Sequence, residues 1–226
     1  MEKQTTSLKQ TAYEYVKEKI LSCEYRPGVF LNENQLCEEM GGISRTPVRD
    51  ALSRLEQDGL VTIMPKRGVM VTEMRISDLN RIFEVRALLE PYALRKYGSR
   101  MDMDAMGRIY AQLRAPEAWE KEGDAEAMKN YYARDNEFHD IIISAMPNPH
   151  LRLLYETVGN LNRRFRVLTG NEVKDRVQKT NKEHLAIVEA CIRQDWEAAA
   201  QAMQEHLEVS RQASMQLMVE NEAIHF

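Results

Sequence analysis

Three of the five histidines lie on the apolar stripes of segments with helical periodicity, so their side chains are expected to point into a core. They are His139, His184 and His206, and Asp135 lies one helical turn before His139 on the same face. Several buried imidazoles need polar partners, and one divalent cation can serve all of them. These four residues therefore predict a metal site. The alternative is that each histidine is a hydrogen-bonded core residue, which is the commoner role of a single inward histidine.

Two further polar residues lie where the helical pattern expects apolar ones. Arg86 is on the apolar stripe of residues 77–97, and Asn162 is on that of residues 149–168. Arg86 either forms a salt bridge with Glu90 or another acid, or binds the carboxylate of a small acid held at the metal. In the second case Asn162 adds a hydrogen bond. The basic run at 163–166 is expected to form a solvated face or the edge of a dimer.

A second kind of chemistry is indicated by Arg45 and Arg49, which lie four residues apart near the start of an amphipathic segment, Ile43–Leu60. Both guanidiniums would project from one helix tip, off the buried stripe. The tip also carries unpaired backbone N–H groups and the positive end of the helix dipole, so it suits phosphate or the acceptor edge of guanine. The alternative is an ordinary amphipathic helix with solvated arginines.

The helix that positions these arginines has start and stop signals of its own. Thr46 is expected to cap its N-terminus, Pro47 suits the first helical position, and Gly59 suits the far end. Upstream, Glu33–Met40 is expected to be a short helix, followed by a glycine turn. The two helices together predict a helix-turn-helix.

The flanks of this helix pair extend the prediction. A first helix is expected over 5–23. Downstream, Leu60–Met64 and Val69–Val71 are short apolar runs joined by a basic turn that contains Lys66, Arg67 and Gly68, which predicts a β-hairpin with a basic tip. A hairpin of this kind forms a wing, which adds a DNA contact to that of the helix.

This half of the chain resembles the GntR-type bacterial transcription regulators. The resemblance rests on the stretch from Ser44 to Leu52, on Leu55 and Gly59-Leu60-Val61, and on Arg67-Gly68 in the wing. In that family the arginines of the helix and the residues of the wing contact DNA. The resemblance therefore implies contacts through Arg45, Thr46, Arg49, Lys66, Arg67 and Gly68.

From residue 77 onward the pattern is helical throughout, in six segments. They cover about 77–97, 102–113, 124–145, 149–168, 173–194 and 196–221. The expected fold is therefore mainly α, with a winged helix-turn-helix and a small β-hairpin at residues 1–76 and an all-α bundle at residues 77–226. The first domain is expected to bind DNA, and the second to bind an effector and to dimerise.

The second half resembles the FadR/FCD branch of the same family, and the six helices resemble its VanR-like subgroup. Many members of this branch bind a metal through D-x-x-x-H on one helix and a histidine on each of the last two helices. Asp135, His139, His184 and His206 occupy those places. Three imidazoles and one carboxylate suit zinc, nickel or manganese and do not select sharply among them. Members often sense organic or sugar acids.

Composition limits the remaining classes. The formal net charge is −4, and no stretch approaches the length of an apolar membrane span, so a cytoplasmic protein without membrane contact is expected. The three cysteines are odd in number and scattered, which favours reduced thiols. Residues 1–76 hold as many acidic as basic side chains, so DNA binding must depend on local placement and gains from a dimer.

The leading hypothesis is a homodimeric transcription factor, expected to be a repressor. It would bind an inverted-repeat operator and respond to a small carboxylate metabolite at or near a metal. One rival is a metal-dependent enzyme that activates water at the three-histidine, one-aspartate centre. The other is a regulator whose helical domain is purely structural.

Overall fold

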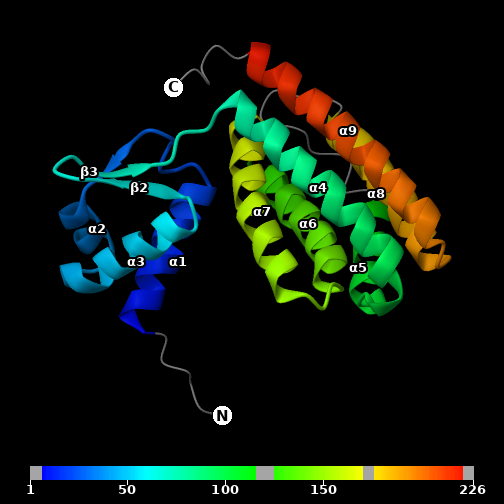
Figure 1. The fold of residues 1–226 in the computed structure, drawn as a ribbon, viewed down its shortest axis with the longest axis horizontal. Helices are drawn as coiled ribbons and strands as arrows, with labels where there is room; N and C mark the ends of the chain where they lie inside the picture. The colour runs from blue at the N-terminus through cyan, green and yellow to red at the C-terminus, as the bar shows by residue number, and fades with distance from the viewer. Residues whose placement is uncertain (1–6, 116–124, 170–175, 221–226) are drawn as a thin grey trace. The chain divides into compact units, whose positions relative to one another are not determined.

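The computed structural model describes residues 7–115, 125–169 and 176–220. The chain divides between Arg75 and Ile76 into two compact units (Figure 1). The first unit combines helices with a small sheet, and the described residues of the second are helical. This confirms the expected fold class.

The N-terminal unit is built around the helix that carries the two arginines. Its elements are α1 (Leu8–Leu21), β1 (Phe30–Leu31), α2 (Glu33–Glu39), α3 (Arg45–Gln57), β2 (Val61–Met64) and β3 (Gly68–Val71). The stripe of α3 that includes Val48, Leu52 and Leu55 is buried, and it packs in one core with Ile20 of α1 and Leu36 of α2. The 3.6-residue periodicity of α3 thus leaves its other face, with Arg45 and Arg49, exposed.

The start of α3 differs from the prediction. The N-cap is Ser44, in an extended conformation, and α3 begins at Arg45. Thr46 and Pro47 are therefore the second and third helical residues, so the predictions that Thr46 is the cap and that Pro47 is the first helical residue are both wrong. Pro47 fits there because backbone N–H groups of the first turn have no partner within the helix. At the other end Gly59 has φ 73°, so the prediction that it closes the helix is confirmed.

The sheet has the strand order β1-β3-β2, with both pairs antiparallel. Strands β2 and β3 form the expected hairpin, with Met64 opposite Gly68. The third strand, formed by Phe30 and Leu31, is not among the elements predicted from the sequence. They pair with Met70 and Val69. A two-residue strand is too short to show a period, which explains why the sequence pattern did not reveal it.

The helical unit contains six α-helices among its described residues. They are α4 (Ile76–Tyr97), α5 (Met103–Arg114), α6 (Ala125–Ser144), α7 (Pro149–Thr169), α8 (Arg176–Ile192) and α9 (Trp196–Glu220), with a 3₁₀ turn, η1 (Gly98–Arg100), after α4. The expected segments agree with these to within a few residues, although the ends expected at 124, 173 and 221 lie outside the described residues. Helix α4 packs along α9 and α7, and α8 packs along α9.

Candidate metal centre and nucleic-acid interface

The structure brings the three inward histidines and Asp135 together. Asp135 and His139 come from α6, His184 from α8 and His206 from α9, and all four are buried. The possible ligand nitrogens of the histidines lie within 4.8 Å of one another, with 3.3 Å between Nε2 of His184 and Nε2 of His206. Asp135 places Oδ1 3.8 Å from His184 Nε2 and Oδ2 4.0 Å from His139 Nε2.

Two carboxylates orient the imidazoles from behind. Nδ1 of His139 donates to Oε2 of Glu90 at 2.6 Å, and Nδ1 of His206 donates to Oε2 of Glu183 at 2.7 Å. Nε2 is then the unprotonated nitrogen of each ring: that of His139 lies 3.1 Å from an Nη group of Arg86, and that of His206 lies 3.3 Å from Nε2 of His184. This is the usual arrangement of metal-binding histidines, whose other nitrogen donates to a carboxylate or carbonyl.

Electrostatics keep the histidines neutral. Burial lowers the pKa of His139, lowers that of His206 to about 4, and lowers that of His184 well below its ordinary value. The neighbouring His206 and His139 reinforce the shift at His184. Burial alone would raise the pKa of Glu90, but the charge of Arg86 and the hydrogen bond from His139 hold it well below its ordinary value. Neutral imidazoles beside ionised carboxylates are the protonation states that cation binding requires.

The lowered histidine pKa values predict that the metal-free protein loses stability in mild acid. An imidazole held neutral in the folded state contributes stability above the unfolded pKa of about 6.5, and this is lost as the pH falls through the folded value, about 4 for His206. We expect the free energy of unfolding, measured by urea titration with a chelator present, to fall in that window by on the order of 3 kcal/mol for His206 alone. The variant His206→Leu should show a shallower fall, and an identical pH profile would contradict the assignment.

A pocket adjoins the histidine centre. Its walls include Arg86, Asp135, His139, Asn162 and His206, and its volume is about 80 Å³. A buried water needs about 10–15 Å³ by the same measure, so the cavity has room for a small metabolite of a few heavy atoms. Arg86 and Asn162, predicted from the sequence as ligand-binding residues, thus line the same pocket as His139 and His206.

Arg86 forms the salt bridge with Glu90 that is one of its two predicted roles. Its Nε donates to Glu90 at 2.7 Å, which is the expected salt bridge, while an Nη group lies 3.1 Å from Nε2 of His139. The hydroxyl of Tyr155 also donates to Glu90, at 2.8 Å. The fully buried Glu90 therefore ties the arginine of the pocket to one histidine of the centre.

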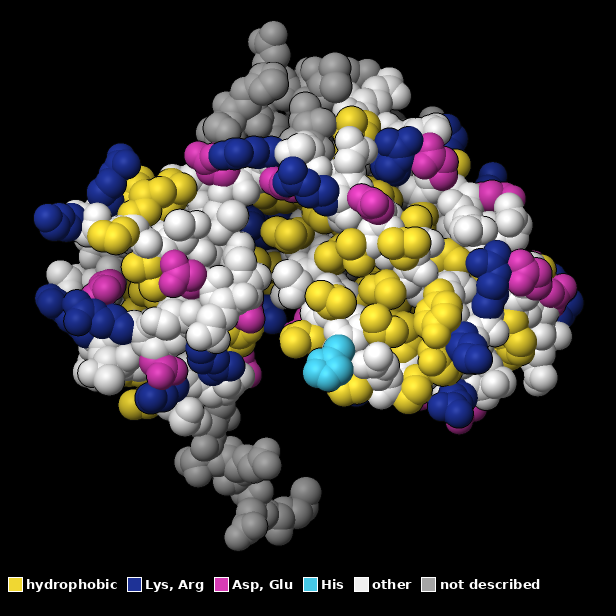
Figure 2. Space-filling view, in the orientation of Figure 1, with side chains coloured by type: hydrophobic (Ala, Val, Ile, Leu, Met, Phe, Trp, Pro, Cys, Tyr) yellow, Lys and Arg dark blue, Asp and Glu magenta, His cyan; other side chains and the backbone are white. Residues whose placement is uncertain are grey.

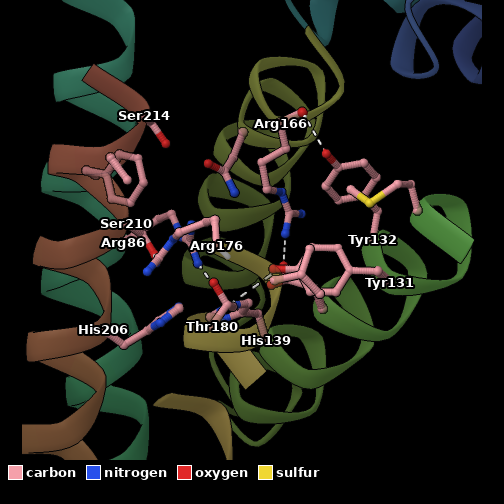
Figure 3. A pocket seen from close by; sticks show the side chains of 16 residues that line it. Arg86, Tyr131, Tyr132, His139, Arg166, Arg176, Thr180, His206, Ser210 and Ser214 are labelled. Atoms are coloured by element: carbon pink, nitrogen blue, oxygen red, sulfur yellow. Dashed lines mark hydrogen bonds and ion pairs between the residues drawn. The ribbon is translucent and has the colours of Figure 1, made fainter. Parts of the chain in front are cut away.

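Two pocket arginines were not predicted. Arg166 of α7 forms an ion pair with Asp135, and Arg176 of α8 contacts Glu183 at 2.9 Å. Figure 3 shows Arg166 reaching from α7 toward the centre of the pocket, with Tyr131 and Tyr132 of α6 beside it.

The prediction that residues 163–166 form one solvated face or a dimer edge is wrong. Arg164 and Phe165 are buried, and Arg166 lines the pocket. Successive helical residues are rotated by about 100°, so four in a row surround the helix and cannot share one face.

The predicted DNA-binding residues lie at two exposed tips of the N-terminal unit. Arg45, Thr46 and Arg49 are exposed at the start of α3, and Lys66, Arg67 and Gly68 are exposed at the turn between β2 and β3. Figure 2 shows Lys and Arg side chains along the edge of this unit where both tips lie. Nε of Arg49 donates to Glu33 of α2 at 2.8 Å, which orients its guanidinium.

The other two histidines do not lie on an apolar stripe of the sequence. His150 is exposed, and His225 lies outside the described residues.

In the part of the chain that the structure describes, every helix is too short or too polar to cross a membrane.

Comparison with known proteins agrees with this geometry. Residues 8–71 match the family described as bacterial regulatory proteins, gntR family, and residues 81–209 match the FCD domain. FCD domains are effector-binding domains known to hold metal ions, which agrees with the three-histidine group found here.

Individual relatives match along most of the chain. YdhC of Bacillus subtilis, an uncharacterised HTH-type transcriptional regulator, is 29% identical over 198 residues, which cover 86% of this chain and 85% of YdhC. The HTH-type transcriptional repressor RspR of Escherichia coli is 24% identical over 221 residues, 96% of this chain and 93% of RspR. The solved structure of McbR/YncC from E. coli has a TM-score of 0.77 at 20% identity, covering 93% of this chain and 98% of that one.

The rival hypothesis of a metal-dependent enzyme finds no support in these relatives, which are transcription regulators. The chain belongs to the GntR family of bacterial regulators, carries an FCD effector-binding domain, and is a DNA-binding transcription regulator rather than an enzyme.

Proposed function

We propose that this regulator binds an inverted-repeat operator as a homodimer and represses transcription. Residues 1–76 act as the DNA-binding domain, in which Arg45, Thr46 and Arg49 enter the major groove and Lys66, Arg67 and Gly68 contact the backbone or minor groove. The exposure of both tips supports these roles. The protein acts where its DNA is, in the cytoplasm.

An apolar surface supports the dimer. Leu88 and Tyr92 of α4 and Leu153 and Leu154 of α7 are exposed, and these two helices pack against each other. Figure 2 shows hydrophobic side chains gathered on this face of the helical unit. A contiguous exposed apolar patch of this kind is typical of a protein interface. The helical domain, residues 77–226, is therefore proposed to dimerise as well as to bind the effector.

The proposed metal ligands are Asp135, His139, His184 and His206, and the metal is zinc, nickel or manganese. The observation that carries this proposal is the convergence of three neutral imidazoles within 4.8 Å, two of them oriented by carboxylates from behind. A bound divalent ion would supply a Lewis acid for one carboxylate of the effector.

The proposed effector is a small organic or sugar acid. Arg86 would bind its carboxylate and Asn162 would add a hydrogen bond, because both line the pocket beside the histidines and both are buried. Occupancy of this pocket would change the spacing of the two DNA-binding domains and so the affinity for the operator.

The test is operator binding with and without metal and acid. An operator is first selected from random duplexes with the purified protein, and small organic and sugar acids are then screened for release of that duplex. We expect an acid to weaken operator binding at least several-fold in the metal-loaded protein and to lose this effect after chelation. Release that is unchanged by chelation would contradict the shared site. A protein with no metal and no responding acid would favour a purely structural helical domain.

A further inference from the structure

The charges around the pocket balance before any ligand binds. Three arginines line it, and each pairs with a carboxylate: Arg86 with Glu90, Arg166 with Asp135, and Arg176 with Glu183. The three histidines of the centre are buried, and a histidine binds a metal cation in its neutral form. A divalent cation would therefore add two positive charges to a neutral and largely buried site, where excess charge is costly.

Asp135 has two competing partners. Its Oδ2 pairs with Arg166, while its Oδ1 lies 3.8 Å from Nε2 of His184, on the side of the histidine centre. A carboxylate that coordinates a cation gives up part of its negative charge to it, so it holds a guanidinium less strongly. In the metal-loaded protein Arg166 would therefore need a new anionic partner.

Arg166 is not fully satisfied by Asp135. One Nη group donates to Asn136, but its Nε is buried and has no hydrogen-bond partner among the described residues. Its guanidinium extends from α7 into the pocket, among the labelled side chains of Figure 3, so a small ligand there would meet it directly.

We infer that Arg166 exchanges partners: it pairs with Asp135 in the metal-free protein and with one acidic group of a dianionic effector in the metal-loaded protein. This inference rests on the proposed function and narrows the effector to acids that carry two negative charges, such as dicarboxylates. The second acidic group faces Arg86 and the histidine centre. Metal and effector then bind cooperatively: each raises the affinity of the protein for the other, and by the same factor.

The exchange predicts opposite effects of one substitution on two ligands. Arg166→Gln removes the competitor for Asp135, so affinity for Zn²⁺ should rise several-fold. The same change removes a charge-assisted hydrogen bond to the acid, so affinity for the acid should fall on the order of 10- to 100-fold. A purely structural role for Arg166 would instead weaken both ligands together.

The experiment uses isothermal titration of the full-length protein, first with Zn²⁺ and then with acids. The panel contains linear and hydroxylated dicarboxylates of three to six carbons and the monocarboxylates of the same lengths, each titrated with and without Zn²⁺. In the wild type, a dicarboxylate should bind at least tenfold more tightly with Zn²⁺ than without it, and more tightly than its monocarboxylate. Arg166→Lys, which keeps the charge, should recover part of the acid affinity.

The control is Arg152→Gln, which removes an exposed arginine from the same helix and should leave both affinities unchanged. Weaker binding of both ligands by Arg166→Gln, or equal binding of mono- and dicarboxylates, would overturn the inference while leaving the proposed metal site intact. Absence of metal binding in the wild type would instead count against the proposed function itself. Circular dichroism of each variant separates these outcomes from misfolding.

Discussion

Replacing Arg49 with alanine is expected to abolish operator recognition while leaving the folded dimer intact. Arg49 is exposed near the start of α3, and its hydrogen bond to Glu33 uses one of the five donors of its guanidinium. A bidentate contact from arginine to guanine contributes about 1–3 kcal/mol, and a dimer makes it twice. The loss is therefore about 2–6 kcal/mol, on the order of 30-fold to 10⁴-fold in the dissociation constant.

The measurement compares the selected operator with a scrambled duplex by fluorescence anisotropy. Arg49→Ala should bind both duplexes with nearly equal, weak affinity. The comparison variant is Arg67→Ala at the hairpin tip, where a backbone contact is proposed. It should weaken both duplexes by the same factor and flatten the salt dependence. An unchanged ratio of operator to scrambled affinity in Arg49→Ala would remove α3 from the recognition role.

Much of the fold follows from periodicity within single segments. The stripe that includes Val48, Leu52 and Leu55 predicts both the helix and the face that it buries, and the structure buries all three. The same reasoning placed His139, His184 and His206 inside the bundle, where each is at most 4% exposed. A pattern of this kind reports which face of a helix is inward, which is sufficient to nominate residues for a site.

Contacts between helices could not be predicted in this way. Glu90 was considered only as a partner of Arg86 within one helix, four residues away, but it also binds His139 across 49 positions in sequence. Glu183 precedes His184 in the chain yet orients His206 on the next helix. Such pairings depend on how the helices pack, and the period of one helix carries no information about them.

Arg166 shows most clearly what was missed in the sequence pattern. A run of basic residues suggested solvent, yet it contributes a buried guanidinium to α7 at Arg164 and another arginine to the pocket. A test of angular position would have separated the residues of this run, because Asn162 and Arg166 are four apart and so share the inward face. The four-residue spacing thus indicated that Arg166 points inward, but the basic composition of the run suggested exposure instead.

Replacing His184 with alanine is expected to remove the stabilisation by metal. Nε2 of His184 lies 3.3 Å from that of His206 and 3.8 Å from Asp135, so its loss leaves no compact ligand set in the described residues. Free metal at 100 times its dissociation constant should stabilise the wild type by about 2.7 kcal/mol. For a chain of this size the midpoint of thermal unfolding should rise by about 5–10 °C. In His184→Ala the midpoint should not rise when metal is added. A thermal shift assay measures the midpoint of both proteins.

The control and the metal-free baseline decide between a metal centre and a hydrogen-bonded core. His150→Ala removes an exposed histidine from α7 and should retain the full shift. If His184 served only as a core hydrogen-bonding residue, its loss would leave a buried partner unsatisfied and destabilise the chelated protein by about 1–3 kcal/mol. If His184 is a metal ligand, its imidazole in the chelated wild type lies beside two others at a buried site that lowers its own pKa. Removing it should then cost the chelated protein less stability. A large loss without metal, combined with no shift in the wild type, would assign the three histidines to the core.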